Sequence, residues 1–554
     1  MERMSTSHSL VLGPLLRFVG EHDASIWVET AQTSTVSVHA DGRTWSAATF
    51  RVEGHHYALV LLDGLEPGRT YEYRVSVGEE HVWPLADSTF PASTIATLDR
   101  SRPTRLAFGS CRTSVPHDAE HHRTDGVDAL RTLALSLAEG QVARPEVLAL
   151  LGDQVYADVT SPRMQQFIAS RRDPSQPPWE EIRDYQEYAE LYRLAWSEPA
   201  IRWALSCLPS TMIFDDHDIR DDWNTSWAWH QEMNATSWWH ERLVGGLVSY
   251  WVYQHIGNLA PEELAADEIW SLLDAPAGHE VDLTQELRSM VERVDEDPKA
   301  YRWSYTRDLG DSRLIVLDSR AARVLEPDHR AMLDPVELEW LDEQMTGDVD
   351  HIFIGTSLPF MLEPGLHDAE AIIESLSAPD RSRPVRRAAE KIRQGVDLEH
   401  WAAFQSGFVE VFELVMSVGR GERGRAPATI TFLSGDVHHS YVAEVIDPAA
   451  HGSHSRIVQA VCSPIRNPMP RGLRVLMSQM AAGLVRPMRW WAGRTKSVPD
   501  PLYPWKVTHG PWFDNNLAVA EVDGPKLTLR WVTGDVVDGN DERPQLRVVS
   551  TVEV

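Results

Sequence analysis

The sequence predicts a layered α/β domain preceded by a smaller all-β domain. Residues 1 to about 100 show strand-like alternation, as in 25–30 and 35–38, with turn residues between the strands. From about residue 101, short apolar runs typical of buried strands alternate with helical stretches, as in an α/β domain. Polar side chains follow several of these strands directly. We therefore expect domains at 1–100 and 101–554, with the functional site in the second.

Length, charge and cysteine content narrow the classes of protein. A chain of 554 residues is too long for one ordinary core. A formal net charge of −30 argues against nucleic acid as a stable partner. Neither a signal peptide nor a run of about 20 apolar residues is visible, so we expect a cytoplasmic protein. The odd number of widely spaced cysteines fits reduced thiols.

The first domain resembles an immunoglobulin or fibronectin type III (Ig/FnIII-like) β-sandwich. Residues 65–75, Leu-Glu-Pro-Gly-Arg-Thr-Tyr-Glu-Tyr-Arg-Val, are similar to the tyrosine corner of these sandwiches, with Tyr71 at the corner. We expect Trp27 to fill the core between the two sheets. No residue pattern in this domain indicates chemistry, so we interpret it as a structural module.

Residues able to bind a metal close four of the strands in the second domain. The strands are 104–108, 147–150, 211–214 and 429–433. The residues that follow them are Cys111, Asp153, Tyr156, Asp216, Asp436 and His438. One such ending is an ordinary turn, but strand ends of an open α/β sheet converge on one edge, where ligands bind. Four endings together indicate a dinuclear metal centre.

Four motifs occur in the order seen in the alkaline phosphatase D (PhoD-like) metallophosphatases. They are Gly-Ser-Cys at 109–111, Gly-Asp-Gln-Val-Tyr-Ala-Asp at 152–158, Asp-Asp-His-Asp at 215–218 and Ser-Gly-Asp-Val-His-His at 434–439. Leu-Asp-Ser-Arg at 317–320 and a tryptophan-centred helix at His400-Trp401 also resemble the family. The resemblance covers nearly the whole chain. It implies a calcineurin-like metallophosphatase sandwich of two mixed sheets flanked by helices, and a phosphoric ester hydrolase.

The resemblance also implies a ligand set for two metal ions. The first ion would be held by Cys111, Asp153, Tyr156 and His438. The second would be held by Asp153, Asp216 and Asp436, with Asp153 bridging. The family implies Fe³⁺ at the first site and Ca²⁺ or another divalent ion (Zn²⁺, Mn²⁺ or Mg²⁺) at the second. A thiolate and a phenolate favour a trivalent ion, and an all-oxygen site suits a hard divalent cation.

The resemblance also gives His217 a role, and neighbouring residues become candidates by their positions in the sequence. His217 occupies the place of the general acid that protonates the leaving group, and Asp218 is expected to orient its imidazole. Arg112 is a candidate catalytic residue that contacts phosphate, and Arg320 is a second candidate for phosphate contact. A surface or helix-capping salt bridge is the alternative for each arginine. His439, next to a ligand, is a candidate substrate contact at the mouth of the site.

Two features of the sequence depart from related patterns. Asp221 and Asp222 stand where members of the family tend to carry asparagine, and a further carboxylate there would add a metal ligand or repel phosphate. The strand that ends at Thr356-Ser357 has no histidine, where the broader calcineurin-like metallophosphatases place one.

The rest of the second domain is expected to surround the site. Residues 160–300 are predicted to form helical insertions, and 513–554 to form antiparallel strands that extend the second sheet, with Asp523-Gly524 as a hairpin turn. Within 470–512, the stretch 471–496 combines basic side chains with apolar ones at helical spacing and a Trp-Trp pair. We favour a cap that steers anionic substrates; the alternative is a helix lying on a membrane surface.

The leading hypothesis is a metal-dependent phosphatase that acts on a small phosphate ester. A phosphodiesterase or phospholipase D-type hydrolase remains open, because the same metal clamp serves monoesters and diesters. A catalytically silent, metal-stabilised binding protein is a third alternative. The His217-Asp218 pair argues against it, since a structural metal site needs no general acid.

Overall fold

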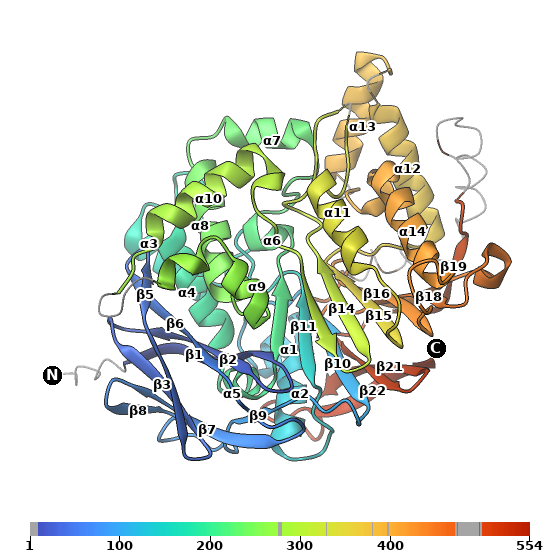
Figure 1. Cartoon of the computed structure of the whole chain (residues 1–554). Helices are drawn as coiled ribbons and strands as arrows, with labels where there is room; N and C mark the ends of the chain where they lie inside the picture. Colours follow the sequence, from blue (N-terminus) through green and yellow to red (C-terminus); the bar gives the residue numbers. More distant parts are fainter. Residues whose placement is uncertain are drawn as a thin grey trace.

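The computed structural model describes residues 9–554 apart from 275–279, 328, 379, 396–397, 471, 473, 475–497 and 499–500. Its described strands form four sheets, two in an N-terminal β-sandwich and two in a larger α/β sandwich. In Figure 1 the small sandwich lies against one side of the larger one and contacts its helices. This arrangement confirms the predicted fold class.

The N-terminal sandwich is built from antiparallel strands. One sheet has the order β1-β2-β6-β5: β1 (Leu10–Val19), β2 (Ala24–Thr30), β6 (His55–Leu62) and β5 (Phe50–Val52). The other has the order β4-β3-β7-β8, with β9 on β7: β4 (Arg43–Ala48), β3 (Thr35–Ala40), β7 (Thr70–Val77), β8 (Glu80–Trp83) and β9 (Thr94–Ala96). The Tyr71 hydroxyl accepts a hydrogen bond from the Glu66 backbone N–H at 2.8 Å, which is the tyrosine-corner contact.

Trp27 does not lie between the two sheets, which corrects the prediction from the sequence. Its neighbours Ile26 and Val28 point into the inter-sheet core, and Trp27 points to the opposite face of β2. There its ring lies 5.2 Å from the ring of Tyr253, between centroids, in the helical part of the larger sandwich. Both faces of β2 are buried, so the small sandwich and the large one share a core.

The first sheet of the large sandwich has the order β12-β11-β10-β20-β21-β22. Its strands are β12 (Ser210–Ile213), β11 (Val147–Leu151), β10 (Thr104–Gly109), β20 (Leu517–Asp523), β21 (Lys526–Asp535) and β22 (Gln545–Glu553). β10, β11 and β12 are parallel, so their carboxyl ends lie at one edge. The last three strands are antiparallel, as predicted, but they join this first sheet through β10, whereas the sequence analysis expected them to extend the second sheet.

The second sheet has the order β13-β14-β15-β16-β18-β17-β19. Its strands are β13 (Tyr305–Leu309), β14 (Ser312–Leu317), β15 (His351–Thr356), β16 (Thr429–Ser434), β18 (Arg456–Val461), β17 (Ser440–Val445) and β19 (Trp505–Trp512). β14, β15, β16 and β18 are parallel. β19 pairs with β17 as an edge strand, so this part of the expected cap is sheet.

Alternate residues of the second sheet serve two cores. Leu314 and Val316 of β14 pack toward the first sheet, and Ile315 and Leu317 pack toward the helices outside. The outer helices are α11 (Pro335–Gln344), α12 (Pro364–Ser377), α13 (Arg383–Gly395) and α14 (Gln405–Gly419). The two sheets thus stack with the carboxyl ends of their parallel strands on one side.

Helices cover the molecule between β10 and β13 as well. Before β12 they are α1 (Ala119–Thr124), α2 (Ala129–Ala138), α3 (Pro162–Arg171), α4 (Tyr185–Trp196) and α5 (Pro199–Cys207). After β12 they are α6 (Asp216–Ile219), α7 (Trp227–Asn234), α8 (Trp239–Tyr250), η1 (Trp251–His255), α9 (Pro261–Ala266), η2 (Trp270–Asp274) and α10 (Thr284–Glu296). The tryptophans of this region pack largely on one another and on tyrosines, as between Trp229 and Trp239.

The basic stretch 471–496 lies almost wholly outside the described residues. Of its basic residues only Arg474 is described, and its guanidinium lies 5.8 Å from the centre of the Phe513 ring. Among the described helices, none has the length and apolarity needed to span a bilayer. The choice between a cap and a membrane-surface helix stays a prediction.

Replacing Trp27 with alanine should destabilise both sandwiches together. The cavity would lie in the shared core, where such truncations lower the free energy of unfolding by about 3–5 kcal/mol. Urea denaturation followed by far-UV circular dichroism should show one transition at lower urea. Leu61→Ala, on the exposed side of β6, is the control and should change the free energy by less than about 0.5 kcal/mol. Loss of the N-terminal domain alone, with unfolding of the rest unchanged, would contradict the shared core.

Candidate metal centre

The predicted metal ligands come together where the two sheets meet. Cys111, Asp153 and Asp216 follow β10, β11 and β12 of the first sheet. Asp436 and His438 follow β16 of the second sheet. The turns contact each other through the backbone: the Cys111 N–H donates to the Gly152 carbonyl at 3.3 Å. The carboxyl ends of parallel strands therefore place all five side chains in one buried region.

Two glycines allow the turns to approach this closely. A Cβ added to Gly152, whose φ is +104°, would lie 2.8 Å from the Asp215 Cβ. A Cβ added to Gly435 would lie 1.8 Å from the Ser110 Oγ. Each glycine immediately precedes a candidate ligand, Asp153 or Asp436. The Gly-Asp pairs in the sequence thus reflect a steric requirement as well as a turn.

Four candidate ligands adopt the left-handed backbone conformation. Their φ values are +57° for Cys111, +48° for Asp153, +64° for Asp436 and +52° for His438. This conformation costs free energy for residues other than glycine, and in proteins it clusters at functional sites. Here it follows from turning the chain sharply after each strand, so that the side chain points into the gap between the sheets.

The first cluster matches the predicted first metal site. One ligand atom each of Cys111, Asp153 and His438 lies within 4.8 Å of the other two. The Tyr156 hydroxyl lies 3.4 Å from Asp153 Oδ2 and accepts a hydrogen bond from Asn467 Nδ2 at 2.9 Å. The four predicted ligands therefore lie close together, with Asn467 holding the phenol in place.

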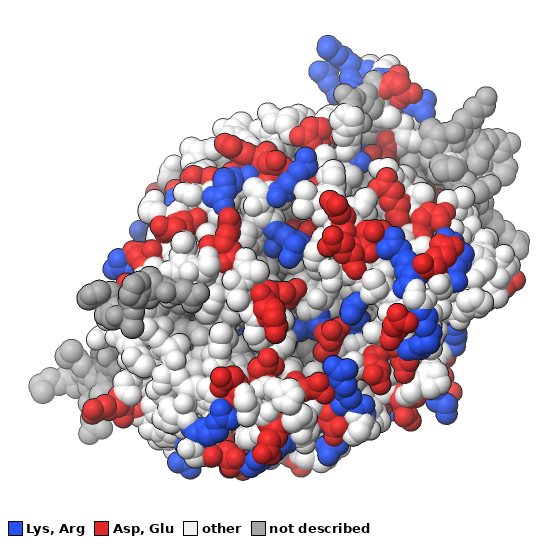
Figure 2. Space-filling model, viewed as in Figure 1, with Lys and Arg blue, Asp and Glu red and all other residues white. Residues whose placement is uncertain are grey.

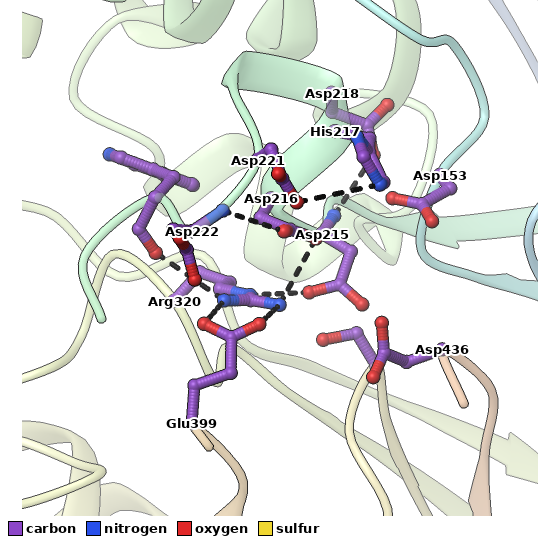
Figure 3. Close-up of polar contacts among 12 residues, drawn as sticks. Asp153, Asp215, Asp216, His217, Asp218, Asp221, Asp222, Arg320, Glu399 and Asp436 are labelled. Carbon is purple, nitrogen blue, oxygen red and sulfur yellow. Dashed lines mark hydrogen bonds and ion pairs between the residues drawn. The ribbon is translucent and has the colours of Figure 1, made fainter. Parts of the chain in front are cut away.

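The second cluster contains one carboxylate more than the sequence predicted. Asp215, Asp216 and Asp436 offer oxygens within 4.8 Å of one another, and Asp153, Asp216 and His217 form an overlapping group. Figure 3 shows Asp436 facing Asp215 from the other sheet. Asp215 and Asp216 follow β12 as a pair of adjacent aspartates. This pair was the feature of the sequence that could have identified Asp215 as a member of the cluster.

The charge of this region calls for cations. Asp153 Oδ1 and Asp215 Oδ2 are buried and have no hydrogen-bond partner among the described residues. Burial raises the pKa of Asp153 well above its usual value, and Asp215 and Asp216 raise it further. Burial also raises the pKa of the Cys111 thiol, with Asp153 and Asp436 adding to the effect. Buried carboxylate oxygens without partners, crowded beside a buried thiol, fit metal ions that would neutralise them.

His217 lies beside this cluster, but its partner is not the predicted one. Its Nδ1 lies 2.9 Å from Asp158 Oδ2. Asp218 instead accepts a hydrogen bond from the Asp215 N–H at 2.9 Å and completes the capping box of α6. Asp158 belongs to the motif 152–158 and is almost fully buried. The residue that orients the imidazole is therefore Asp158.

Comparisons with known proteins identify the chain. The family described as PhoD-like phosphatase matches residues 128–485, more than half of the sequence. The chain belongs to the PhoD-like phosphatase family. A domain of unknown function (DUF7800) matches residues 7–95, the N-terminal sandwich. A search of curated proteins by sequence found no match.

Comparison with solved structures finds the same architecture in a phosphatase structure. A structure described as PhoD aligns with a TM-score of 0.58 at 14% identity, covering 99% of this chain and 94% of the other. The purple acid phosphatase PPD1 from yellow lupin (Lupinus luteus) seeds aligns with a TM-score of 0.47 at 9% identity, covering 98% of this chain and 73% of the other. The first likeness extends over both sandwiches. It shows the shared fold. The family match makes this PhoD-like phosphatase a metal-dependent phosphoesterase, and the silent binding protein is set aside.

In this PhoD-like phosphatase, Arg320 forms ion pairs with carboxylates of the second cluster, whereas the sequence suggested a contact with phosphate. Its fully buried guanidinium forms ion pairs with Asp215, with Asp216 at 3.1 Å and with Glu399 (Figure 3). The Asp318 carboxylate accepts three backbone N–H bonds, from residues 320–322 at 2.7–2.9 Å, and so fixes the turn that carries Arg320. Arg320 is therefore a positioning residue of the second cluster.

Two other predicted substrate contacts are engaged elsewhere. Arg112 is buried, and its Nε donates to Asp128, the N-cap of α2, at 2.9 Å. This is the helix-capping salt bridge that the sequence left as an alternative. His439 has no exposed surface and pairs with Glu363 at 2.5 Å, so it does not line the mouth of the site.

The two aspartates that depart from the family pattern, Asp221 and Asp222, lie at the edge of the centre. Asp221 is 60% exposed in its side chain, and its Oδ1 lies 3.8 Å from His217 Nε2. Asp222 donates its backbone N–H to Asp216 Oδ2 at 3.0 Å. Neither carboxylate belongs to the clusters around Cys111 or Asp436 among the described residues. Asp221 thus contributes negative charge beside the proposed acid.

His400 is a residue of the centre that sequence reasoning missed. Its Nε2 lies 3.1 Å from Asp436 Oδ2, and its Nδ1 lies 2.7 Å from Glu370 Oε1 on α12. The predicted helix at His400 is a short 3-10 turn, η4 (Trp401–Ala403), ahead of α14. The His400-Trp401 pair was the only local signal, because the contact joins segments 36 residues apart in the chain.

Proposed function

We propose that this PhoD-like phosphatase hydrolyses small phosphate esters by attack of water at phosphorus, with His217 as the general acid. The observation that carries the proposal is the placement of His217. It lies within 4.8 Å of Asp153 and Asp216, and Asp158 holds its Nδ1. A histidine at the border of a metal cluster, with one nitrogen fixed by a buried carboxylate, has the geometry of a proton donor.

The donor sets support the metal assignment implied by the family. Cys111, Asp153, Tyr156 and His438 would hold Fe³⁺, because three of these donors carry negative charge when bound. Asp153, Asp216, Asp436 and the additional Asp215 would hold Ca²⁺ or another divalent ion. When bound, the two ions supply Lewis-acid neutralisation of phosphoryl charge and make a water nucleophilic near neutral pH.

His217 is equipped to stay protonated until the leaving group departs. Burial alone would lower the pKa of His217, but Asp158 and Asp216 reverse this effect and raise it well above its usual value. With Nδ1 bonded to Asp158, the proton on Nε2 is the one available to the leaving oxygen. Donation to that oxygen avoids release of a free alkoxide, which is the usual benefit of a general acid.

A phosphodiesterase is the second candidate, and Asp221 favours it. The exposed Asp221 carboxylate lies 3.8 Å from His217 Nε2, on the side where the leaving group must sit. A monoester is largely a dianion at alkaline pH, and a diester is a monoanion. Fixed negative charge at this position repels the dianion more strongly. Parallel assays of monoesters and diesters decide between the two substrate classes.

His217→Ala should lower kcat by about 10²–10⁴-fold for an alkyl phosphate, because the proton donor is lost. The loss should be smaller for p-nitrophenyl phosphate, whose leaving group needs little protonation. Elemental analysis should find the metal content unchanged. The matched control is His240→Ala, an exposed histidine on α8, which should retain full activity. Equal losses for both substrates, or loss of metal, would show that His217 is not the acid.

Asp158→Asn should move the alkaline limb of the kcat profile to lower pH. The negative charge of Asp158 raises the pKa of His217, so its removal lets the imidazolium lose its proton earlier as pH rises. Activity that depends on the protonated form then falls at lower pH. Asp221→Asn is the control and should shift the limb less, because that carboxylate is more distant and more exposed. An unmoved limb in Asp158→Asn would contradict the pairing.

A further inference from the structure

A second concave site lies apart from the metal centre, along α13. It is a cavity of about 320 Å³ between the start of α7, the chain at 325–330, the end of α12 and one side of α13. Its volume lies within the range of small-molecule sites. Figure 2 shows basic side chains gathered at the top of the molecule, where Figure 1 places α13. None of its lining residues belongs to the metal clusters of the described chain.

The lining of this cavity, which we name the arginine pocket, is strongly basic. Its ionisable residues are Arg330, Arg383, Arg386, Arg387, Arg393, Glu374 and Glu390. Five arginines thus face two glutamates in a chain whose formal net charge is −30. A local excess of positive charge against such a background is a signal for an anionic ligand.

Two of the arginines form the rigid base of the pocket. Arg393 pairs with Glu374 at 2.5 Å and with Glu390 at 3.2 Å, and Arg330 pairs with Glu374 at 3.2 Å. Glu390 is also fixed by the hydroxyl of Ser226. Both glutamates of the pocket therefore form ion pairs with Arg330 or Arg393, and neither pairs with the other three arginines that line it.

The other three arginines lack acidic partners. Within the described part of the chain, no ion pair joins Arg383, Arg386 or Arg387 to a carboxylate, and the buried Nε of Arg386 has no hydrogen-bond partner. Positive charge is crowded at the base as well. Burial lowers the pKa of Arg330 to about 10, and Arg393 contributes to the same effect despite Glu374. An anion would relieve this crowding and satisfy the free donors.

One wall of the pocket is apolar. Trp227 is 39% exposed, and Ala228, Leu325 and Pro327 line the cavity beside it. A large exposed aromatic ring in a site with guanidinium groups suits a ligand with an anionic part and a planar or apolar part.

We propose that the arginine pocket binds a small organic phosphate. The phosphate group would contact Arg383, Arg386 and Arg387, whose planar forks match phosphate oxygens. The organic part would lie against Trp227. This site is separate from the one that hydrolyses esters, so the proposal does not depend on the assignment of His217.

Isothermal titration of the metal-loaded enzyme tests the proposal. The probes are α,β-methylene adenosine diphosphate, which has phosphate and a planar ring, and pyrophosphate, which lacks the ring. Wild type should bind the first probe at two sites per chain, one at the metal centre and one in the pocket. A variant carrying Arg383→Gln, Arg386→Gln and Arg387→Gln should retain one site, with kcat and KM for p-nitrophenyl phosphate within twofold of wild type. Arg163→Gln, an exposed arginine on α3, is the control for loss of one charge and should retain both sites.

The outcomes separate the parts of the proposal. Trp227→Ala should weaken the nucleotide analogue at the second site at least tenfold and leave pyrophosphate within twofold. Equal weakening of both probes, or of neither, would overturn the role of Trp227. The same number of sites in wild type and in the triple variant would overturn the pocket itself. A thermal melt with an unchanged midpoint shows that the fold of each variant is intact. If the triple variant melts at a lower temperature, the double variant Arg383→Lys, Arg387→Lys, which keeps both charges, takes its place and should bind the probe more weakly than wild type. Binding equal to wild type would contradict the contacts between the planar guanidinium groups and phosphate.

Discussion

Mutual repulsion among buried carboxylates is the constraint on which this structure depends. Asp153, Asp215 and Asp216 are buried between the two sheets, and the partly exposed Asp436 lies beside them, so water screens their charges poorly. Some of their charge is balanced by Arg320, and Asp436 is further stabilised by His400. The remainder requires cations. The crowding of carboxylates is thus the feature that makes this cluster a candidate metal site.

The positions of the surrounding residues follow from this constraint. Asp318 fixes the turn that aims Arg320, and Glu399 shares its guanidinium. Glu370 fixes His400 from α12, so the outer helices also support the centre. The N-terminal sandwich supports the helical side through Trp27 and the ring of Tyr253. The polar centre at the strand ends is supported by residues from nearly every part of the chain. Sequence motifs identify the candidate ligands but not these supporting residues.

The sequence predicted the fold class and the strand-end residues that the structure brings together, because both depend on local patterns. Apolar runs identify buried strands, and the geometry of parallel sheets brings their ends together. Contacts between distant segments were not predictable in the same way. Asp218 was chosen as partner of His217 by adjacency, yet consecutive helical residues point in different directions, and Asp218 caps its own helix. Asp158 and His400 reach the site from other segments.

Alternation also has a limit where both faces of a strand are buried. The alternation of residues along β2 correctly places Trp27 on the opposite face from Ile26 and Val28. It does not show which of these two faces packs against the other sheet of the N-terminal sandwich. The partner of a charged side chain is equally hard to predict from neighbouring residues. The position of Arg112 after Cys111 suggested a contact with phosphate, but its partner in the structure is Asp128, the N-cap of a helix further along the chain. Such pairings are set by tertiary packing.

The central claim is that metal ions in the carboxylate cluster are required for ester hydrolysis. Elemental analysis of protein purified without chelator, combined with assays of p-nitrophenyl phosphate and bis-p-nitrophenyl phosphate before chelation, after it and after metal add-back, tests the claim most directly. We predict two metal ions per chain, loss of turnover as they are removed and recovery on their return. Full turnover of either ester by protein shown to be free of metal would contradict the account.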